Sequence, residues 1–222
     1  MKRRALLAAA WAGPAAAQYA RIENASSAHW HARVAAFAQE RVVPGGIVFL
    51  GDSMTERFPL QALLGAATPR ALVNRGIGGD KVGGWRYWGL LDRLDAVLAL
   101  HPAQLVLMIG INDLTHAGTP FDSLLPHATR LLERLQGLPQ VLVQAVLPVR
   151  DSLAVHAPRL APYNAHLRRE CQRLNLQWLD LHADFADADG ALDLAWAADA
   201  VHLNTAGYRR WAEALKPRLR GA

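Results

Sequence analysis

A serine stands at the centre of the most reactive pattern in the chain, the segment Gly51-Asp52-Ser53, which follows an apolar run over residues 46–50. Where a strand passes into a helix, a serine lies at the sheet edge with its amide at the positive end of the helix dipole. That position suits a nucleophile whose own N–H helps to hold a developing oxyanion. A helix N-cap requires the same residue at the same place, so this segment alone leaves both interpretations open. The G-x-S-x-G nucleophile elbow is absent around Ser53.

Three glycines follow the second apolar run, in the segment Gly76-Ile77-Gly78-Gly79-Asp80, called the glycine loop below. Glycines let a backbone turn tightly and present bare N–H groups to a ligand. Lys81 occupies the position where a dinucleotide fingerprint needs glycine, and the Gly-Lys-Ser/Thr of a phosphate loop is missing. The loop is therefore interpreted either as a simple turn or as a source of oxyanion donors.

An asparagine follows the third apolar run, in Gly110-Ile111-Asn112-Asp113. Its side-chain NH₂ could point into the same cleft as the serine hydroxyl. Asparagine at such a place also commonly forms an Asx-turn that caps the next element, so this segment too has two interpretations.

A serine nucleophile needs a histidine as base and a carboxylate that orients the imidazole. Of the nine histidines, two have an aspartate three residues earlier, in the pairs Asp113–His116 and Asp199–His202. Spacing does not separate the two pairs, since both follow Ser53 in the chain. Position favours His202, because it lies beyond the last predicted strand and just before the final helix. There, the irregular stretch 183–200 could fold back over the strand ends.

The elements that must position these residues alternate along the chain. Apolar, β-branched runs lie at residues 46–50, 71–73, 104–109, 140–146 and 176–181, and the stretches between them carry apolar residues at helical spacing. Short, continuously apolar strands are typical of a parallel sheet covered on both faces. The alternation therefore predicts a doubly wound α/β sheet, in which ligands bind beyond the carboxyl ends of the strands. All four chemical segments above lie at or beyond such ends.

Composition limits the function classes. With 222 residues, of which 52% are hydrophobic, the chain fits one domain with a sizeable core. Residues 1–17 predict a signal peptide cleaved after Ala17, because a basic start precedes a small, apolar stretch that ends in an A-x-A site; a frayed or buried Ala-rich helix is the alternative. The remaining domain, 18–222, carries 21 basic and 19 acidic side chains. This nearly even balance of charge does not indicate a protein that binds nucleic acid. We expect a periplasmic or secreted protein.

Two further features bear on cofactors and membranes. No apolar run reaches the roughly 18–20 residues that span a bilayer. The single cysteine excludes a disulfide framework and a cysteine-based zinc site. The segment His29-Trp30-His31 could ligate a metal, but it has no partner cluster nearby in the sequence and is interpreted as a solvated helix surface.

Taken together, the four segments resemble the SGNH (GDSL-type) hydrolase superfamily. Its hallmarks are a Gly-Asp-Ser near the N-terminus, a turn glycine, a Gly-x-Asn-Asp and a late Asp-x-x-His. They occur here in that order and span residues 47 to 208. Residues 49–54, the glycine loop, residues 146–148 and residues 202–203 are similar to platelet-activating-factor acetylhydrolase catalytic subunits and to bacterial carbohydrate esterases of that branch.

The resemblance implies a flavodoxin-like three-layer α/β/α sandwich with a five-stranded parallel sheet. It implies Ser53 as nucleophile, His202 as base, in preference to His116, and Asp199 as the partner that orients the imidazole. It also implies an oxyanion hole made by the N–H groups of Ser53 and Gly79 and the side chain of Asn112. Gly79 is chosen among the glycines because the family's donor immediately precedes the loop aspartate. No metal and no cofactor is expected.

The expected activity is that of a serine esterase that hydrolyses short acyl esters, acetyl above all, of a carbohydrate or small alcohol. Aromatic side chains near the cleft, at positions Trp85, Tyr87, Trp88 and Trp196, could stack on sugar rings or could equally pack between helix and sheet. Lysophospholipid and thioester substrates stay open, as does a non-catalytic module that binds an acylated glycan. A nucleotide binder is disfavoured, because the phosphate fingerprint and a basic cleft are missing. The oligomeric state cannot be inferred from the sequence.

Overall fold

The computed structural model describes residues 14–84, 88–115 and 120–219. The first thirteen residues of the expected signal peptide, the alternative base His116 and the aromatic positions Trp85 and Tyr87 lie outside the described residues. The expected cleavage point after Ala17 falls within helix α1, Pro14–Gln39.

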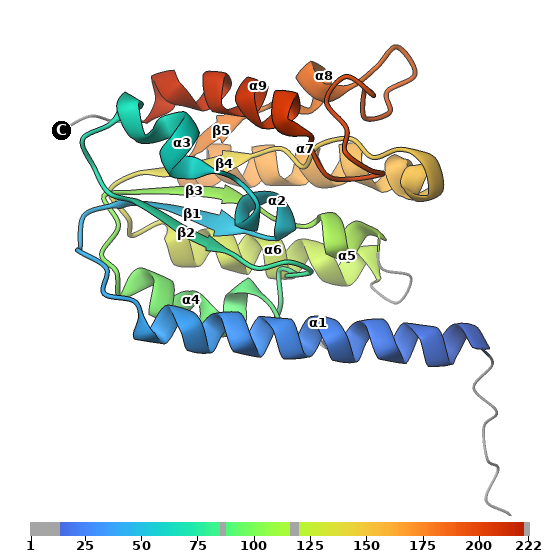
Figure 1. Cartoon of the computed structure of the whole chain (residues 1–222), viewed down its shortest axis with the longest axis horizontal. Coiled ribbons are helices and arrows are strands. Elements are labelled where there is room, and N and C mark those ends of the chain that lie inside the picture. Colours follow the sequence, from blue (N-terminus) through green and yellow to red (C-terminus); the bar gives the residue numbers. More distant parts are fainter. Residues whose placement is uncertain (1–13, 85–87, 116–119, 220–222) are drawn as a thin grey trace, which may run out of the picture.

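A five-stranded sheet forms the centre of the molecule (Figure 1). Its strands are β1 Ile47–Gly51, β2 Leu72–Gly76, β3 Gln104–Met108, β4 Val141–Gln144 and β5 Gln177–Leu179. Every neighbouring pair is parallel, and the order is β2-β1-β3-β4-β5. The predicted strands are thus confirmed, although β2 runs three residues further than its apolar run and ends inside the glycine loop.

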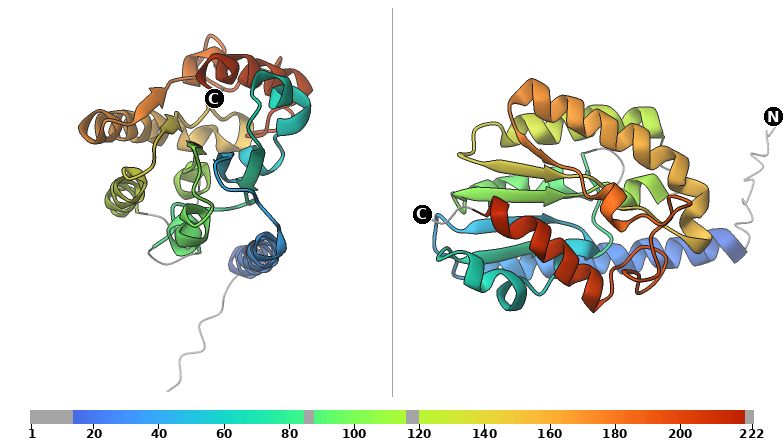
Figure 2. Two further views of the ribbon diagram at one scale, coloured as in Figure 1. Left: turned by 90° about the vertical axis from the view of Figure 1, so that its left-hand side faces the viewer. Right: turned by 90° about the horizontal axis from the view of Figure 1, so that it is seen from above.

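Helices cover both faces of the sheet, which makes the three layers that the resemblance implied (Figure 2). One face is covered by α4 Leu90–Leu98, α5 Ile111–Thr115, α6 Phe121–Leu135 and α7 Ala157–Leu174. The other face is covered by α2 Ser53–Glu56, α3 Leu60–Leu64, α8 His182–Phe185 and α9 Thr205–Leu215. The 3₁₀ turns are η1 Gly65–Ala67, η2 Asp151–His156 and η3 Lys216–Arg218.

Alternation along each strand divides the buried side chains between two cores. In β1, Val48 and Leu50 pack in the core beneath α4, α6 and α7, whereas Ile47 and Phe49 pack beneath α2 and α9. Successive side chains of a strand point to opposite faces, so a strand that is apolar throughout must be covered twice. The sheet is therefore buried on both faces, and the polar side chains that could bind a ligand lie beyond the ends of its strands.

Helix caps hold the two chain segments that lead into the candidate site. Asp52 is the N-cap of α2 and accepts a hydrogen bond from the amide of Met54 at 2.9 Å. Asn204 is the N-cap of α9 and accepts from the amide of Gly207 at 2.9 Å. Such caps satisfy the free amides of a first helical turn. They fix where α2 begins, with Ser53 as its first residue, and where α9 begins, three residues after His202.

Helix α1 runs along the β2 edge, below α4 in Figure 1. The Arg75 guanidinium of β2 lies over the Phe37 ring, 4.5 Å from its centroid, and donates to Glu40 at 2.6 Å. In the described part of the chain, no helix combines the length and the apolar character needed to cross a bilayer.

Candidate active site

Ser53 and His202 meet at the carboxyl edge of the sheet. Ser53 is the first residue of α2, directly beyond β1, and its Oγ lies 2.8 Å from His202 Nε2. The other imidazole nitrogen, Nδ1, lies 2.8 Å from Oδ2 and 3.0 Å from Oδ1 of Asp199. The structure thus brings together in one hydrogen-bonded chain the three residues that the sequence singled out as hydroxyl, imidazole and carboxylate.

Asp199 is held as a carboxylate by its own loop. Burial raises its pKa, but hydrogen bonds from the His202 and Val201 amides and from the His202 ring outweigh burial and lower the pKa to about 2. The two amide bonds measure 2.8 and 2.9 Å. A carboxylate that stays ionised at all ordinary pH values can fix one imidazole tautomer and stabilise a positive charge on the ring.

The loop that carries His202 folds back across the strand ends, as the irregular stretch 183–200 had suggested. The Ala198 amide donates to the carbonyl of His202 at 2.8 Å, and Asn204 donates its amide to Trp196 at 2.7 Å. The Arg150 amide, beyond β4, donates to the carbonyl of Ala200 at 2.9 Å. These backbone bonds fix the imidazole although the segment is neither helix nor strand.

The glycine loop and Asn112 lie together on the other side of Ser53. Asn112 donates its side-chain NH₂ to the carbonyl of Asp80 at 2.8 Å, and the amide of Ile77 donates to Gly51 at 3.1 Å. Gly79 has a φ of +78°, in the region that favours glycine. Among the described residues, the amides of Ser53 and Gly79 donate to no protein acceptor. One Asn112 amide hydrogen is also left over.

Three buried aspartates lie beneath these loops. Burial raises the pKa of Asp52 to about 7 and that of Asp113 to about 7, and repulsion between the carboxyls adds to the shift. Burial also raises the pKa of Asp80, to about 6, although Arg93 opposes it. Arg93 donates to Asp80 Oδ2 from Nε at 3.0 Å and from Nη2 at 2.7 Å. No pattern in the sequence singles out Arg93, because an arginine inside an amphipathic helix gives no local sign of the residue with which it pairs.

A small apolar pocket of about 10 Å³ adjoins the site. Its lining residues are chain neighbours of the site residues, the last residue of β3 or residues that follow β4: Asp52, Met54, Met108, Ile111, Val146, Leu147 and Val201. A space of this size holds about one water molecule or one methyl group.

Aromatic residues lie at the rim beside the glycine loop. Trp88 is 52% exposed and stacks on Trp30, with ring centroids 5.5 Å apart. The expectation of a solvated surface for the segment from His29 to His31 is wrong for Trp30, which is buried and donates its Nε1–H to Asp80 Oδ1 at 3.1 Å. Trp196 instead packs against Arg210, whose guanidinium carbon lies 4.9 Å from the centroid of the Trp196 ring.

Metal ligation has no visible basis in the described segments, where no group of three or more His, Cys, Asp or Glu side chains is arranged to hold an ion. Cys171 is buried in the α7 core, and burial raises its pKa to about 12, so the thiol stays protonated.

Comparisons with known proteins place the chain in a family. The model of the GDSL-like Lipase/Acylhydrolase family matches residues 49–210, which include Ser53, the glycine loop, Asn112 and the Asp199–His202 pair. Among curated proteins, no match was found.

Solved structures share the fold. A candidate platelet activating factor from Streptococcus pneumonia is 24% identical with a TM-score of 0.79, covering 92% of this chain and 99% of its own. A GDSL-like lipase from Bacteroides thetaiotaomicron is 19% identical with a TM-score of 0.71, covering 86% and 97%. The acetylxylan esterase Axe2 from Geobacillus stearothermophilus is 22% identical with a TM-score of 0.63, covering 79% and 94%. With the family model spanning most of its length and these structures sharing its architecture, the chain belongs to the GDSL-like Lipase/Acylhydrolase family and is an SGNH serine hydrolase of the esterase or lipase type.

Proposed function

We propose that this protein hydrolyses short acyl esters, acetyl esters first, of a carbohydrate or small alcohol. The observation that carries the proposal is the continuous hydrogen-bonded chain from Ser53 Oγ through the His202 imidazole to the Asp199 carboxylate. In it, a hydroxyl is within reach of a base, and the base is held by a carboxylate, as acyl transfer requires.

In the proposed reaction, His202 Nε2 accepts the hydroxyl proton as Ser53 Oγ bonds to the carbonyl carbon of the ester. The tetrahedral intermediate collapses, the C–O bond to the alcohol breaks, and Nε2 returns the proton to the leaving oxygen. Water then attacks the acyl-serine with His202 again as base, and the acid leaves as Ser53 regains its proton. Asp199, ionised throughout because its pKa is about 2, stabilises the imidazolium that forms in both steps.

Three donors would hold the negative oxygen of each intermediate: the amides of Ser53 and Gly79 and the side chain of Asn112. Support comes from the two amides, which have no protein acceptor among the described residues, and from the Asn112 amide hydrogen that its bond to Asp80 leaves unused. Donors aimed at a charge that develops only in the transition state contribute strongly to such reactions, and losing one costs about 10²–10³ in kcat.

The size of the apolar pocket supports the preference for acetyl esters. Asp52, Ile111 and Val201, the chain neighbours of Ser53, Asn112 and His202, line this pocket, and its volume of about 10 Å³ suits a group as small as the methyl of an acetyl ester. The half-exposed Trp88 at the rim supports a sugar or another flat alcohol as leaving group, because an indole offers an apolar face with a polar edge.

The test compares the wild type with Ser53→Ala and His202→Ala on p-nitrophenyl acetate. We expect both variants to lose at least about 10³-fold in kcat while keeping native circular dichroism. His116→Ala should keep its activity. Unchanged turnover in the Ser53 or the His202 variant would refute the role of that residue, and an inactive His116 variant beside an active His202 variant would reverse the choice of base.

We also propose that residues 1–17 are a signal peptide and that the domain 18–222 acts in a periplasm or outside the cell. The basic start and the A-x-A site before Gln18 support this. Cleavage there would leave in place every α1 contact described here. Mass spectrometry of the exported protein should find Gln18 at the N-terminus, whereas a chain that begins at Met1 would contradict the proposal.

A further inference from the structure

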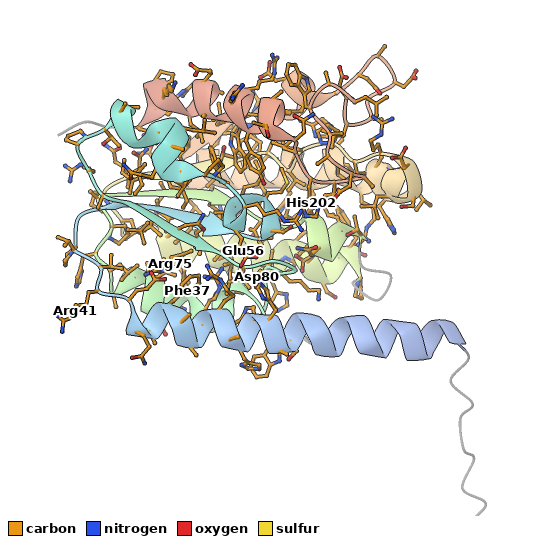
Figure 3. The ribbon with its side chains drawn as sticks, in the orientation of Figure 1. Phe37, Arg41, Glu56, Arg75, Asp80 and His202 are labelled. Carbon is orange, nitrogen blue, oxygen red and sulfur yellow. The ribbon has the colours of Figure 1, made fainter. Side chains whose placement is uncertain are left out.

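Helix α1 precedes the part of the chain that the family model matches, yet it reaches the glycine loop. Figure 3 shows Glu56 and Asp80 between α1 and the region of His202. Glu56 accepts a loop amide and contacts α1 side chains, whereas Asp80 belongs to the loop and accepts from an α1 side chain. The two contacts flank Gly79, whose amide is one of the proposed oxyanion donors.

Glu56, the last residue of α2, holds the residue before Gly79. Its Oε2 accepts the amide of Gly78 at 2.7 Å, while Oε1 lies 3.1 Å from His29 Nε2 and 3.0 Å from Arg33 Nε. The fit is close, since a Cβ at Gly78 would come within 2.9 Å of Glu56 Oε2. His29 and Arg33 lie one helical turn apart on α1, so together they fix the carboxylate that holds Gly78.

Asp80, the residue after Gly79, is held in the same way by Trp30. The indole Nε1–H donates to Asp80 Oδ1 at 3.1 Å, and the same oxygen accepts the amide of Lys81 at 3.0 Å. Trp30 is buried, and its ring stacks on Trp88. The carbonyl of Asp80 in turn receives the side chain of Asn112, so the position of Asp80 sets a second proposed donor.

We propose that Trp30 and Glu56 are positioning residues for the oxyanion hole, through which α1 holds Gly79 and Asn112 in register with Ser53. The inference rests on the proposed function, in which Gly79 and Asn112 stabilise the oxyanion. Donors of this kind act only within about 2.7–3.1 Å of the oxygen. A displacement of about 1 Å can cost on the order of 10²-fold in rate. Helix α1 therefore affects kcat through the position of the oxyanion donors, without contacting the substrate.

The experiment uses the full chain and measures kcat, KM and the thermal midpoint with p-nitrophenyl acetate. Glu56→Ala removes the acceptor of the Gly78 amide, and we expect kcat to fall at least tenfold while KM stays within twofold, because the oxyanion exists only in the transition state. Glu56→Gln keeps an acceptor oxygen and should restore most of kcat. Trp30→Phe keeps an aromatic ring but removes the N–H, and should lower kcat severalfold.

The matched control is Glu40→Ala, which breaks a third carboxylate contact, between the residue that follows α1 and strand β2. Glu40 pairs with the Arg75 side chain, which precedes the glycine loop in the chain. The Glu40→Ala variant should keep the wild-type kcat, although its thermal midpoint falls by about as much as that of Glu56→Ala. Equal losses of kcat in Glu40→Ala and Glu56→Ala, or no recovery in Glu56→Gln, would overturn the inference in favour of general loosening.

Two results separate this inference from the proposed function. If turnover depends on Ser53 but Glu56→Ala and Trp30→Phe keep full kcat, the positioning role is refuted and the esterase proposal stands. If wild-type turnover survives Ser53→Ala, the proposed function itself fails, and the inference fails with it. Should Glu56→Ala not fold, Trp30→Phe and Glu56→Gln decide the question by the same kcat comparison.

Discussion

The hydroxyl oxygen of Ser53 and the Nε2 atom of His202 lie 2.8 Å apart, although 149 positions separate them in the chain. Ser53 is placed by the end of β1 and the N-cap of α2, whereas His202 is placed by a loop that runs into α9. The contact therefore joins the first strand of the sheet to the last helix. A substitution that displaces this loop should therefore also abolish activity, because it moves His202 away from Ser53.

Asp199→Asn should lower kcat by about 10³–10⁴-fold, because an amide can neither hold the required imidazole tautomer nor stabilise its positive charge. Steady-state kinetics with p-nitrophenyl acetate measures the loss. The control is Asp187→Asn in the same irregular segment, since Asp187 also accepts two amides of its own turn, at 3.0 and 2.9 Å. Near-wild-type activity of Asp199→Asn would show that the imidazole needs no carboxylate.

Asn112→Ala should lower kcat by about 10²–10³-fold and leave KM nearly unchanged, because it removes a donor that acts on the transition state. The kinetics should be measured at several substrate concentrations, so that the two constants separate. The opposite pattern, a raised KM with an unchanged kcat, would assign Asn112 to ground-state binding.

Val201→Ala should shift the acyl preference toward longer chains. Val201 lines the small apolar pocket and precedes His202, so truncating it enlarges the space for the acyl group. One methylene in such a pocket changes selectivity by about 10-fold or more, and the ratio of kcat/KM for butyryl over acetyl esters should rise by about that factor.

The matched control for the acyl pocket is Val155→Ala, an equal truncation at a side chain that is 76% exposed and outside the pocket. Its chain-length profile should equal that of the wild type. A wild-type enzyme that already prefers octanoyl esters would contradict the assignment of this pocket to the acyl group.

The buried carboxyl of Asp52 should make stability depend on pH. Burial raises its pKa to about 7, against about 4 in the unfolded chain, so the folded state binds the extra proton between these values. Its contribution is fully present below about pH 4 and is lost as the pH rises through about 7. In urea unfolding, the free energy of unfolding of the wild type should therefore fall relative to that of Asp52→Asn by on the order of 4 kcal/mol between pH 4 and pH 8.

Asparagine can still accept from the Met54 amide, so the α2 cap survives in Asp52→Asn. A difference in unfolding free energy that stays constant with pH would show that Asp52 is already ionised in the folded protein at low pH.

Much of the fold follows from local pattern. Each apolar run became a strand because parallel strands buried on both faces need continuous hydrophobicity, and the segments that follow the runs then had to meet at one edge. The spacing of three residues indicated two candidate pairs, Asp113–His116 and Asp199–His202, and did not choose between them. The roles of Ser53, His202, Asp199, Gly79 and Asn112 stay predictions until the variants are measured.

The sequence by itself determined the parallel sheet, the residues at its carboxyl edge and their order, since periodicity and turn composition are local properties of the chain. Only the tertiary structure decided that Ser53 and His202 come within 2.8 Å and that Trp30 reaches Asp80 from fifty residues away. Contacts of this kind depend on the path of irregular loops and on which face of a helix docks. A tryptophan, a glutamate or an arginine carries no mark of a distant partner, so packing of the whole chain had to bring them together.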